Sequence, residues 1–176
     1  MHGSRQLALD FIKPYLKPGL RVLDVCCGGA WLMEHVHAAG GVYFGIDKRA
    51  KNCEVTERHD VTQIPWIVGQ FDLAISVYGM QHLLGDEAIA WREARRHAKR
   101  MIVVARYDVE TKREMNREDP LNGYSHSSLS GLALATGWSV KEFKGVTYNE
   151  NGYYSPPNEN HLRTLNAFVA YLEEIE

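Results

Sequence analysis

The stretch Arg21-Val-Leu-Asp-Val-Cys-Cys-Gly-Gly-Ala30 decides the fold. It joins a short apolar strand that ends in an acid to a turn of small residues, and helix-like sequence follows over residues 31–39. Gly45-Ile46-Asp47 then forms the end of a second apolar strand, again with an acid at its tip. A strand, a tight turn, a helix and a second acid-tipped strand together predict a nucleotide-binding half-fold.

Strands and helices alternate through the first 106 residues, which predicts a parallel sheet with helices on both faces. Beyond residue 106 the chain becomes polar, and two late apolar stretches are expected to form a hairpin-like pair of strands. The expected helices cover residues 4–16, 30–39, 87–99 and 128–136. The expected strands cover residues 20–25, 42–46, 54–59, 71–77, 101–105, 138–146 and 164–171.

The composition is that of an ordinary globular domain. The chain has 176 residues, of which 45% are hydrophobic and 24% are charged. This length suits a single domain over residues 1–176 with a sizeable core. The net charge of −2 gives no overall attraction to nucleic acid or to an anionic membrane. The basic residues between Arg92 and Arg100 are expected to form a solvated helix face.

The location of the protein is inferred from what the sequence lacks. No apolar run approaches the roughly 20 residues that span a bilayer, and the N-terminus has no signal-peptide pattern. The three cysteines, Cys26, Cys27 and Cys53, do not make a disulfide framework. We therefore expect a cytoplasmic protein that has no membrane segment.

Polar side chains end four of the predicted parallel strands. These are Asp24, Asp47, Asp60 and Ser76, and the carboxyl ends of parallel strands meet at one edge of a sheet, where ligands bind. Three acids and a hydroxyl suit a cationic ligand that carries a ribose, as S-adenosylmethionine does. Asp47 follows Gly28 at the spacing of an acid that accepts hydrogen bonds from ribose hydroxyls. Asp60 and Val61 are expected beside the adenine, the alternative being an ordinary turn aspartate at Asp60.

The order of these motifs resembles that of the class I S-adenosylmethionine-dependent methyltransferases, over nearly the whole chain. Val22–Ala30 resembles the family's first motif, V-L-D-x-G-x-G-x-G. Later motifs are matched by Gly45-Ile46-Asp47, His59-Asp60-Val61, Phe71–Ser76, Gln81-His82-Leu83 and Ala135-Thr136-Gly137-Trp138. The resemblance implies a doubly wound, mostly parallel seven-stranded sheet in the order 3-2-1-4-5-7-6, with an antiparallel last strand. It also implies S-adenosylmethionine as cofactor and S-adenosylhomocysteine as product.

The predicted cofactor-binding residues are Asp24, Cys26, Gly28, Asp47, Lys48, Asp60, Val61, Ser76 and Val77. One departure from the family pattern stands among them. Of the three motif glycines only Gly28 is in register, because Cys26 and Ala30 occupy the other two positions. A positive φ would be strained for a cysteine. A second hypothesis is therefore a non-catalytic module that binds the cofactor or acts as a scaffold. NAD binding fits less well, since its fingerprint needs glycines at these two positions.

Two histidines are candidates for a general base. His82 follows the fourth strand, and an imidazole changes charge near neutral pH. The alternative is that His82 stabilises its loop or lines the cofactor pocket. His126 lies in a segment that faces the acceptor in the resembling family, and the alternative is a position beside a helix N-cap. Tyr78, Tyr124 and Tyr153 are the predicted substrate-side residues.

The predicted reaction is O- or N-methylation of a small molecule. The alternative is a protein or RNA acceptor that rests on an open face. The segments expected around the acceptor are aromatic rather than basic, which makes nucleic acid unlikely. Ser76-Val77-Tyr78-Gly79 also differs from the [DNS]-P-P-[YFW] motif of adenine and cytosine amino-methylation. No metal site is predicted, because His35 and His37 point apart on a helix.

Overall fold

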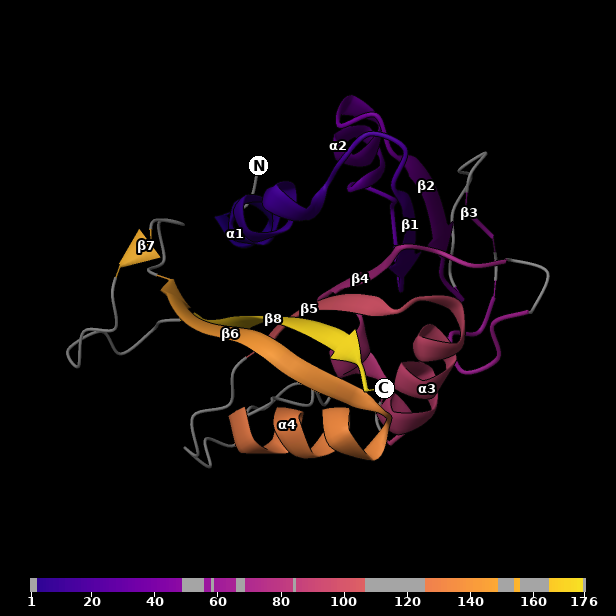
Figure 1. Cartoon of the computed structure of the whole chain (residues 1–176). Coiled ribbons are helices and arrows are strands. Elements are labelled where there is room, and N and C mark those ends of the chain that lie inside the picture. The colour runs from indigo at the N-terminus through magenta and orange to yellow at the C-terminus, as the bar shows by residue number, and fades with distance from the viewer. Residues whose placement is uncertain are drawn as a thin grey trace.

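The structure is a computed structural model that describes residues 3–48, 56–57, 59–65, 69–83, 85–106, 126–148, 154–155 and 165–175. Its strands form one sheet with helices on both faces (Figure 1). The strands are β1 (Arg21–Val25), β2 (Val42–Ile46), β3 (Thr56–Glu57), β4 (Leu73–Val77), β5 (Arg100–Arg106), β6 (Trp138–Tyr148), β7 (Tyr154–Ser155) and β8 (Leu165–Glu174). The helices are α1 (Gly3–Ile12), α2 (Met33–Ala38), α3 (Glu87–His97) and α4 (His126–Ala135), with 3-10 turns η1 (Lys13–Tyr15) and η3 (Met80–His82).

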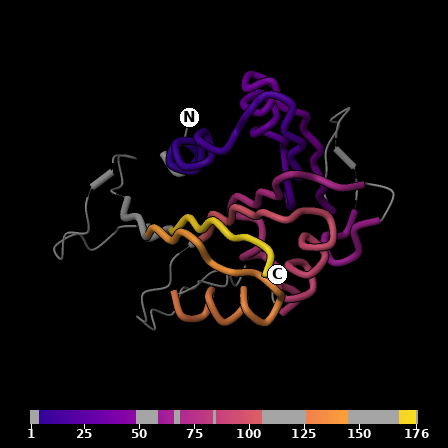
Figure 2. Tube along the Cα trace, in the orientation of Figure 1, coloured from indigo at the N-terminus to yellow at the C-terminus, as the bar shows by residue number. Residues whose placement is uncertain are grey.

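The strand order in the described residues is β3-β2-β1-β4-β5-β8-β6-β7. The first five strands in this order pair in parallel. β8 runs antiparallel to both of its neighbours, β5 and β6. Figure 2 shows this last strand, in yellow, beside the orange β6. The predicted order 3-2-1-4-5-7-6 is confirmed, with β8 as the antiparallel seventh strand. The two-residue β7, which pairs with β6, was not predicted.

Alternation along the strands divides the core between the two faces of the sheet. Val22 of β1 packs with residues of α1 and α2, whereas Leu23 and Val25 pack with residues of α3 and α4. Figure 1 shows these two pairs of helices on opposite sides of the sheet. Trp91 of α3 and Trp138 of β6 are fully buried on the second side, and the indole Nε1 of Trp138 donates to the carbonyl oxygen of Trp91 at 3.1 Å.

The first crossover helix, α2, is shorter than the sequence predicts. Ala30 has a φ of 54°, which a right-handed helix does not accommodate. The chain therefore turns through residues 27–32 before α2 begins at Met33. The helix ends at Ala38, shortly before the predicted stop at Gly40, whose φ of 76° suits a glycine. The amide of Gly41 then donates to the carbonyl of Val36, as in a glycine-terminated helix.

The order of the strands reverses between β1 and β4. From β1 the chain crosses to β2 on one side, and β4 lies on the other side in parallel register, with Asp24 beside Ile75. A reversal of this kind is the topological switch point, outside whose carboxyl strand ends ligands bind in open α/β sheets. We call the end of the sheet at which the parallel strands finish the carboxyl edge. The opposite end, at which they begin, is the amino edge.

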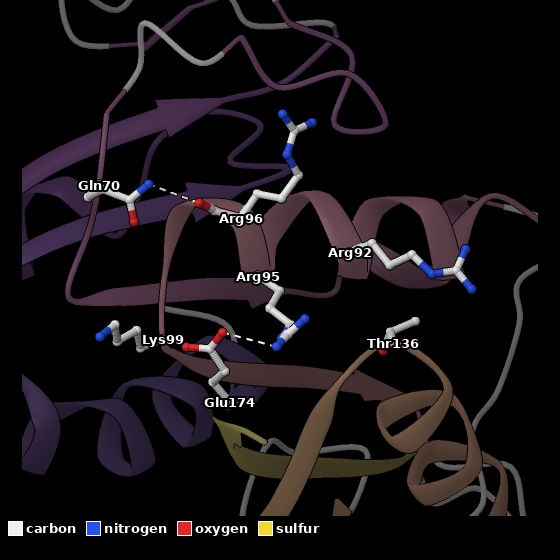
Figure 3. Close-up of a pocket in the computed structure, with 7 residues that line it drawn as sticks. All are labelled: Gln70, Arg92, Arg95, Arg96, Lys99, Thr136 and Glu174. Atoms are coloured by element: carbon white, nitrogen blue, oxygen red, sulfur yellow. Dashed lines mark hydrogen bonds and ion pairs between the residues drawn. The ribbon is translucent and has the colours of Figure 1, made fainter. Parts of the chain in front are cut away.

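A basic hollow lies at the amino edge, between α3, the end of α4 and the end of β8 (Figure 3). Within it, Arg95 pairs with Glu174 at 3.0 Å, and Arg96 pairs with Glu93 at 2.8 Å. The Gln70 side-chain amide donates to the Arg96 carbonyl at 2.9 Å. Of the basic residues that line the hollow, Arg95 and Arg96 are thus paired with acids of this chain. No helix in the described part of the chain is long and apolar enough to cross a membrane.

Candidate functional site

The loop of residues 26–30 follows β1 at the switch point and keeps a glycine-like backbone. Cys26, Gly28 and Ala30 have φ values of 63°, 55° and 54°. These are the three positions at which the family motif has glycine. Left-handed geometry costs an L residue roughly 1–2 kcal/mol because Cβ approaches the carbonyl oxygen. The loop therefore has a left-handed backbone at Cys26 and Ala30, two residues for which this conformation is strained.

Hydrogen bonds from the end of β2 hold loop 26–30 in place. The amide of Cys27 donates to the carbonyl of Ile46 at 3.0 Å, and the amide of Gly28 donates to Asp47 Oδ2 at 3.0 Å. The amide of Ala30 closes the turn on the carbonyl of Cys27 at 2.9 Å. The half-buried Asp47 carboxylate thus lies directly at the loop, as its spacing from Gly28 predicts.

Asp24 lies beneath this loop, on the side of the sheet covered by α1 and α2. Its side chain is almost fully buried, and its Oδ2 accepts a hydrogen bond from the Tyr43 hydroxyl at 2.8 Å. Burial raises the pKa of Asp24 to about 7; the hydrogen bond from Tyr43 opposes this rise and the charge of Asp47 adds to it. Asp24 has little surface to offer a ligand directly, and its predicted cofactor role stays a prediction.

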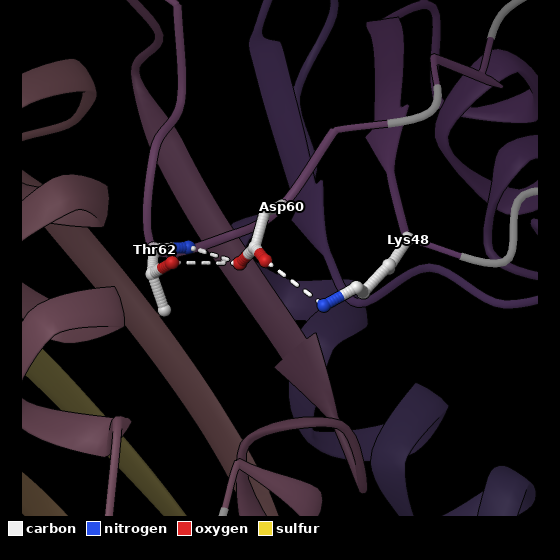
Figure 4. Close-up of polar contacts among 3 residues, drawn as sticks. All are labelled: Lys48, Asp60 and Thr62. Atoms are coloured by element: carbon white, nitrogen blue, oxygen red, sulfur yellow. Dashed lines mark hydrogen bonds and ion pairs between the residues drawn. The ribbon is translucent and has the colours of Figure 1, made fainter.

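Asp60 forms a turn that ties it to two partners (Figure 4). Its Oδ1 accepts from the amide and the hydroxyl of Thr62 at 3.0 and 2.7 Å, and its Oδ2 pairs with Lys48 Nζ at 3.2 Å. The bonds from Thr62, with that from Lys48, lower the pKa of Asp60 to about 2. This geometry is that of the turn aspartate considered as the alternative. Val61, next in the chain, is buried in the core.

Ser76 brings a buried hydroxyl to the switch point at the end of β4. It is fully buried, and its Oγ has no hydrogen-bond partner among the described residues. A Cβ atom built on Gly79 would lie 3.1 Å from this oxygen and 2.2 Å from the Cβ of Cys26. The fold therefore brings Cys26, Ser76 and Gly79 together, while the predicted site residue Val77 is the half-buried last residue of β4.

The predicted acceptor-side residues lie in different parts of the fold. Tyr78 directly follows β4 with a φ of 57°, and its amide donates to the carbonyl of Val104 at 2.7 Å. His82 is exposed at the end of η3. His126 is the exposed first residue of α4, and its ring contacts Phe143 edge-on with centroids 4.7 Å apart. Tyr124 and Tyr153 lie outside the described residues.

Sequence reasoning did not identify three residues that shape this site. Tyr43 supports Asp24, Thr62 orients Asp60, and Gly79 makes room for Cys26. Only Tyr43 carried a usable signal, because it is an aromatic residue with a hydroxyl group on the strand beside β1, which carries Asp24. In the described residues, no three His, Cys, Asp or Glu side chains gather to hold a metal ion.

Comparisons with known proteins bear on this arrangement. Residues 23–101 match the family model described as a methyltransferase domain. No curated protein matches the sequence significantly. The family match and the fold confirm the resemblance that the motifs indicate.

Three solved structures illustrate the likeness. A 1,6-didemethyltoxoflavin-N1-methyltransferase from Burkholderia thailandensis, with bound S-adenosylhomocysteine, has a TM-score of 0.76 at 13% identity, over 98% of this chain and 79% of that one. Magnesium protoporphyrin IX methyltransferase from Synechocystis PCC 6803, with bound S-adenosylmethionine, gives 0.68 at 15%, over 97% and 80%. The small RNA methyltransferase HEN1 gives 0.71 at 12%, over 98% and 25%. At these identities, the likeness shows a shared fold.

The raised pKa of Asp24 predicts a pH-dependent difference between the wild type and Asp24→Asn. Since its folded-state pKa is about 7 and its ordinary value is 3.8, the stability contributed by the neutral carboxyl is full below pH 4 and is lost as the pH rises through 7. As the pH rises from 5 to 8, thermal melts should therefore show that the wild type loses stability relative to Asp24→Asn. Asp86→Asn, at an exposed acid, is the control. A difference that stays constant for Asp24→Asn would contradict the assignment.

Proposed function

We propose that this chain, whose residues 23–101 match the methyltransferase domain model and whose fold is that of S-adenosylmethionine-binding methyltransferases, methylates an oxygen or nitrogen atom of a small molecule. The observation that carries the proposal is the loop 26–30 at the switch point, glycine-like in backbone and bonded to Asp47. The acceptor class rests on separate evidence, the charge of the segments expected around it.

Three features of this chain fit the cofactor. The left-handed residues 26, 28 and 30 keep the backbone path of the family's glycine motif. The Asp47 carboxylate stands at that loop, where it can accept from ribose hydroxyls. The Ser76 hydroxyl, which has no partner among the residues that the structure describes, supplies a buried polar group at the switch point. We assign these groups to the cofactor site, together with Val77, Lys48, Asp60 and Val61 on the strand ends.

When bound, S-adenosylmethionine supplies a methyl carbon that its positively charged sulfur makes electrophilic. The chain's own task is to hold an acceptor atom in line with that carbon, since alignment at about 3–3.5 Å provides much of the acceleration. We assign Tyr78, Tyr124 and Tyr153 to the acceptor side. His82, on η3 just beyond β4, would take the proton that an alcohol, phenol or amine loses, with His126 as the second candidate.

Charge supports a small acceptor over RNA. Residues 108–127 carry five acids and three basic residues, and residues 147–160 carry no Lys or Arg. A surface that tracks phosphates needs an excess of basic groups. Among the described residues, neither Cys26 nor Cys27 forms a disulfide, and we place the protein in the reducing cytoplasm.

Cofactor binding depends, in this proposal, on Asp47. Asp47→Ala should weaken S-adenosylhomocysteine binding at least tenfold in calorimetry, because it removes charge-assisted hydrogen bonds worth about 1.5–3 kcal/mol. Asp10→Ala, at an exposed acid on α1, should leave the affinity unchanged. An unchanged affinity in Asp47→Ala would mean that the ribose lies elsewhere. If the wild type binds neither S-adenosylmethionine nor S-adenosylhomocysteine at millimolar concentration, the enzyme reading fails.

The acceptor class is tested by following the methyl group. We expect that label from methyl-labelled S-adenosylmethionine, incubated with the protein and a cell extract, enters the fraction below about 3 kDa. Heat-treated protein is the control for background transfer. Label that enters protein or RNA instead would assign a macromolecular acceptor, and binding without transfer to any fraction would favour the non-catalytic module.

General-base catalysis by His82 gives a separate expectation. His82→Ala should lower kcat by about 10²–10⁴ on the acceptor found above, because a positioned base contributes that factor. The affinity for S-adenosylhomocysteine should stay within threefold, since His82 is assigned to the acceptor. His37→Ala, at an exposed histidine on α2, serves as the matched variant. A kcat within threefold of the wild type rules out His82 as the base.

A further inference from the structure

Gly79 is a glycine because of the side chain of Cys26. Its φ of −88° and ψ of −51° are accessible to any L residue, so the backbone does not demand glycine. The space does, because an added Cβ would lie 2.2 Å from the Cβ of Cys26 and 3.2 Å from its Sγ. The Cβ of Cys26 is fixed by the backbone of loop 26–30 and cannot turn aside. One Cβ atom therefore fits between these two positions, and this chain carries it on residue 26.

This contact lies where a ligand is expected. Cys26 is the first residue after β1, and Gly79 is the second residue after β4, the parallel neighbour of β1 at the switch point. The Ser76 hydroxyl lies 3.1 Å from the same built atom, fully buried and without a partner among the described residues. A buried hydroxyl that has no partner in the described part of the chain is a candidate to bond a polar ligand beside the contact.

Gly79 also connects the contact to the acceptor side. The amide of His82 donates to the carbonyl of Gly79 at 3.0 Å and thereby closes η3. At the other end of segment 78–82, the amide of Tyr78 donates to Val104 of β5 at 2.7 Å. The segment is thus bonded to β5 at Tyr78 and closed on itself from Gly79 to His82, and the Cys26 side chain packs against it at Gly79.

We propose that Cys26 is a positioning residue, whose Cβ, packed on Gly79, sets the distance between loop 26–30 and the segment that carries Tyr78 and His82. This inference rests on the proposed function, because loop 26–30 is the assigned cofactor loop. Cys26 thereby places the candidate base relative to the cofactor without itself touching the proton. In this chain residue 26 carries the one Cβ for which there is room, and we call its transfer to residue 79 the exchange.

Four variants test the exchange. Gly79→Ala should weaken S-adenosylhomocysteine binding at least tenfold, because two Cβ atoms cannot share the space and the loop must shift. The double variant Cys26→Gly/Gly79→Ala should restore binding to within threefold of the wild type. Cys26→Ala/Gly79→Ala keeps the Cβ on residue 26, so it should bind as weakly as Gly79→Ala. Cys26→Gly alone removes the Cβ while Gly79 stays a glycine, and its effect is measured at His82.

The position of His82 is measured separately from cofactor binding. The ring signals of His82 in NMR spectra, assigned by comparison with His82→Ala, should move in Cys26→Gly with S-adenosylhomocysteine bound and stay in place in Cys26→Ala. Unmoved signals in Cys26→Gly would overturn the positioning role. A Cys26→Gly/Gly79→Ala variant that binds as weakly as Gly79→Ala, or a Gly79→Ala that binds normally, would overturn the exchange.

Two further results distinguish failure of the exchange from failure to fold and from failure of the cofactor assignment. If Gly79→Ala does not fold, recovery of the wild-type melting temperature in Cys26→Gly/Gly79→Ala supports the exchange, and a Cys26→Gly/Gly79→Ala variant that also fails to fold overturns it. If the wild type binds no cofactor while the melting temperatures follow the exchange, the cofactor assignment and the positioning role fail and the packing relation stands.

Discussion

The hydrogen bond from the Gly28 amide to the Asp47 carboxylate fixes the relation between the two strand ends on which the site is built. Loop 26–30 exposes this amide toward the end of β2, and it does so with a left-handed backbone at Cys26 and Gly28. That backbone in turn delays α2 to Met33, because Ala30 cannot enter a right-handed helix. The strain at Cys26 and Ala30 is offset by bonds from the loop to Ile46, Asp47 and Cys27.

The acids at the strand ends differ in their protonation chemistry although they share a residue type. Asp24 is buried beside a single hydroxyl, so its pKa rises toward neutrality. Asp60 accepts three hydrogen bonds and its pKa falls. Asp47 follows β2, the strand between those of the other two acids, and its Oδ2 accepts a hydrogen bond from the Gly28 amide. A cationic ligand at this edge would meet negative charge on Asp60 and, near neutral pH, a partly protonated Asp24 whose ionisation the ligand's charge favours.

The sequence supported the fold better than it supported the site. The alternation of strands and helices, with an antiparallel last strand implied by the family motifs, was enough for the strand order, because each parallel crossover has one favoured hand. The late start of α2 escaped prediction, because Ala30 favours a right-handed helix by propensity and only the loop's bonds reverse that preference. The acids were found from their spacing. Their partners Tyr43 and Thr62 were not, because side-chain contacts depend on which face each residue occupies.

The Cys26–Gly79 pair shows why a motif residue is better read together with its spatial neighbour. Taken alone, a cysteine at a glycine position suggests a degenerate site, since it adds strain and bulk where a cofactor should approach. The bulk, however, is directed at Gly79, where the absence of a Cβ provides room for it. The two positions are 53 residues apart, and they meet only because β1 and β4 pair at the switch point. A departure from the motif that is accommodated in this way is compatible with the proposed cofactor site, because the added Cβ lies against Gly79.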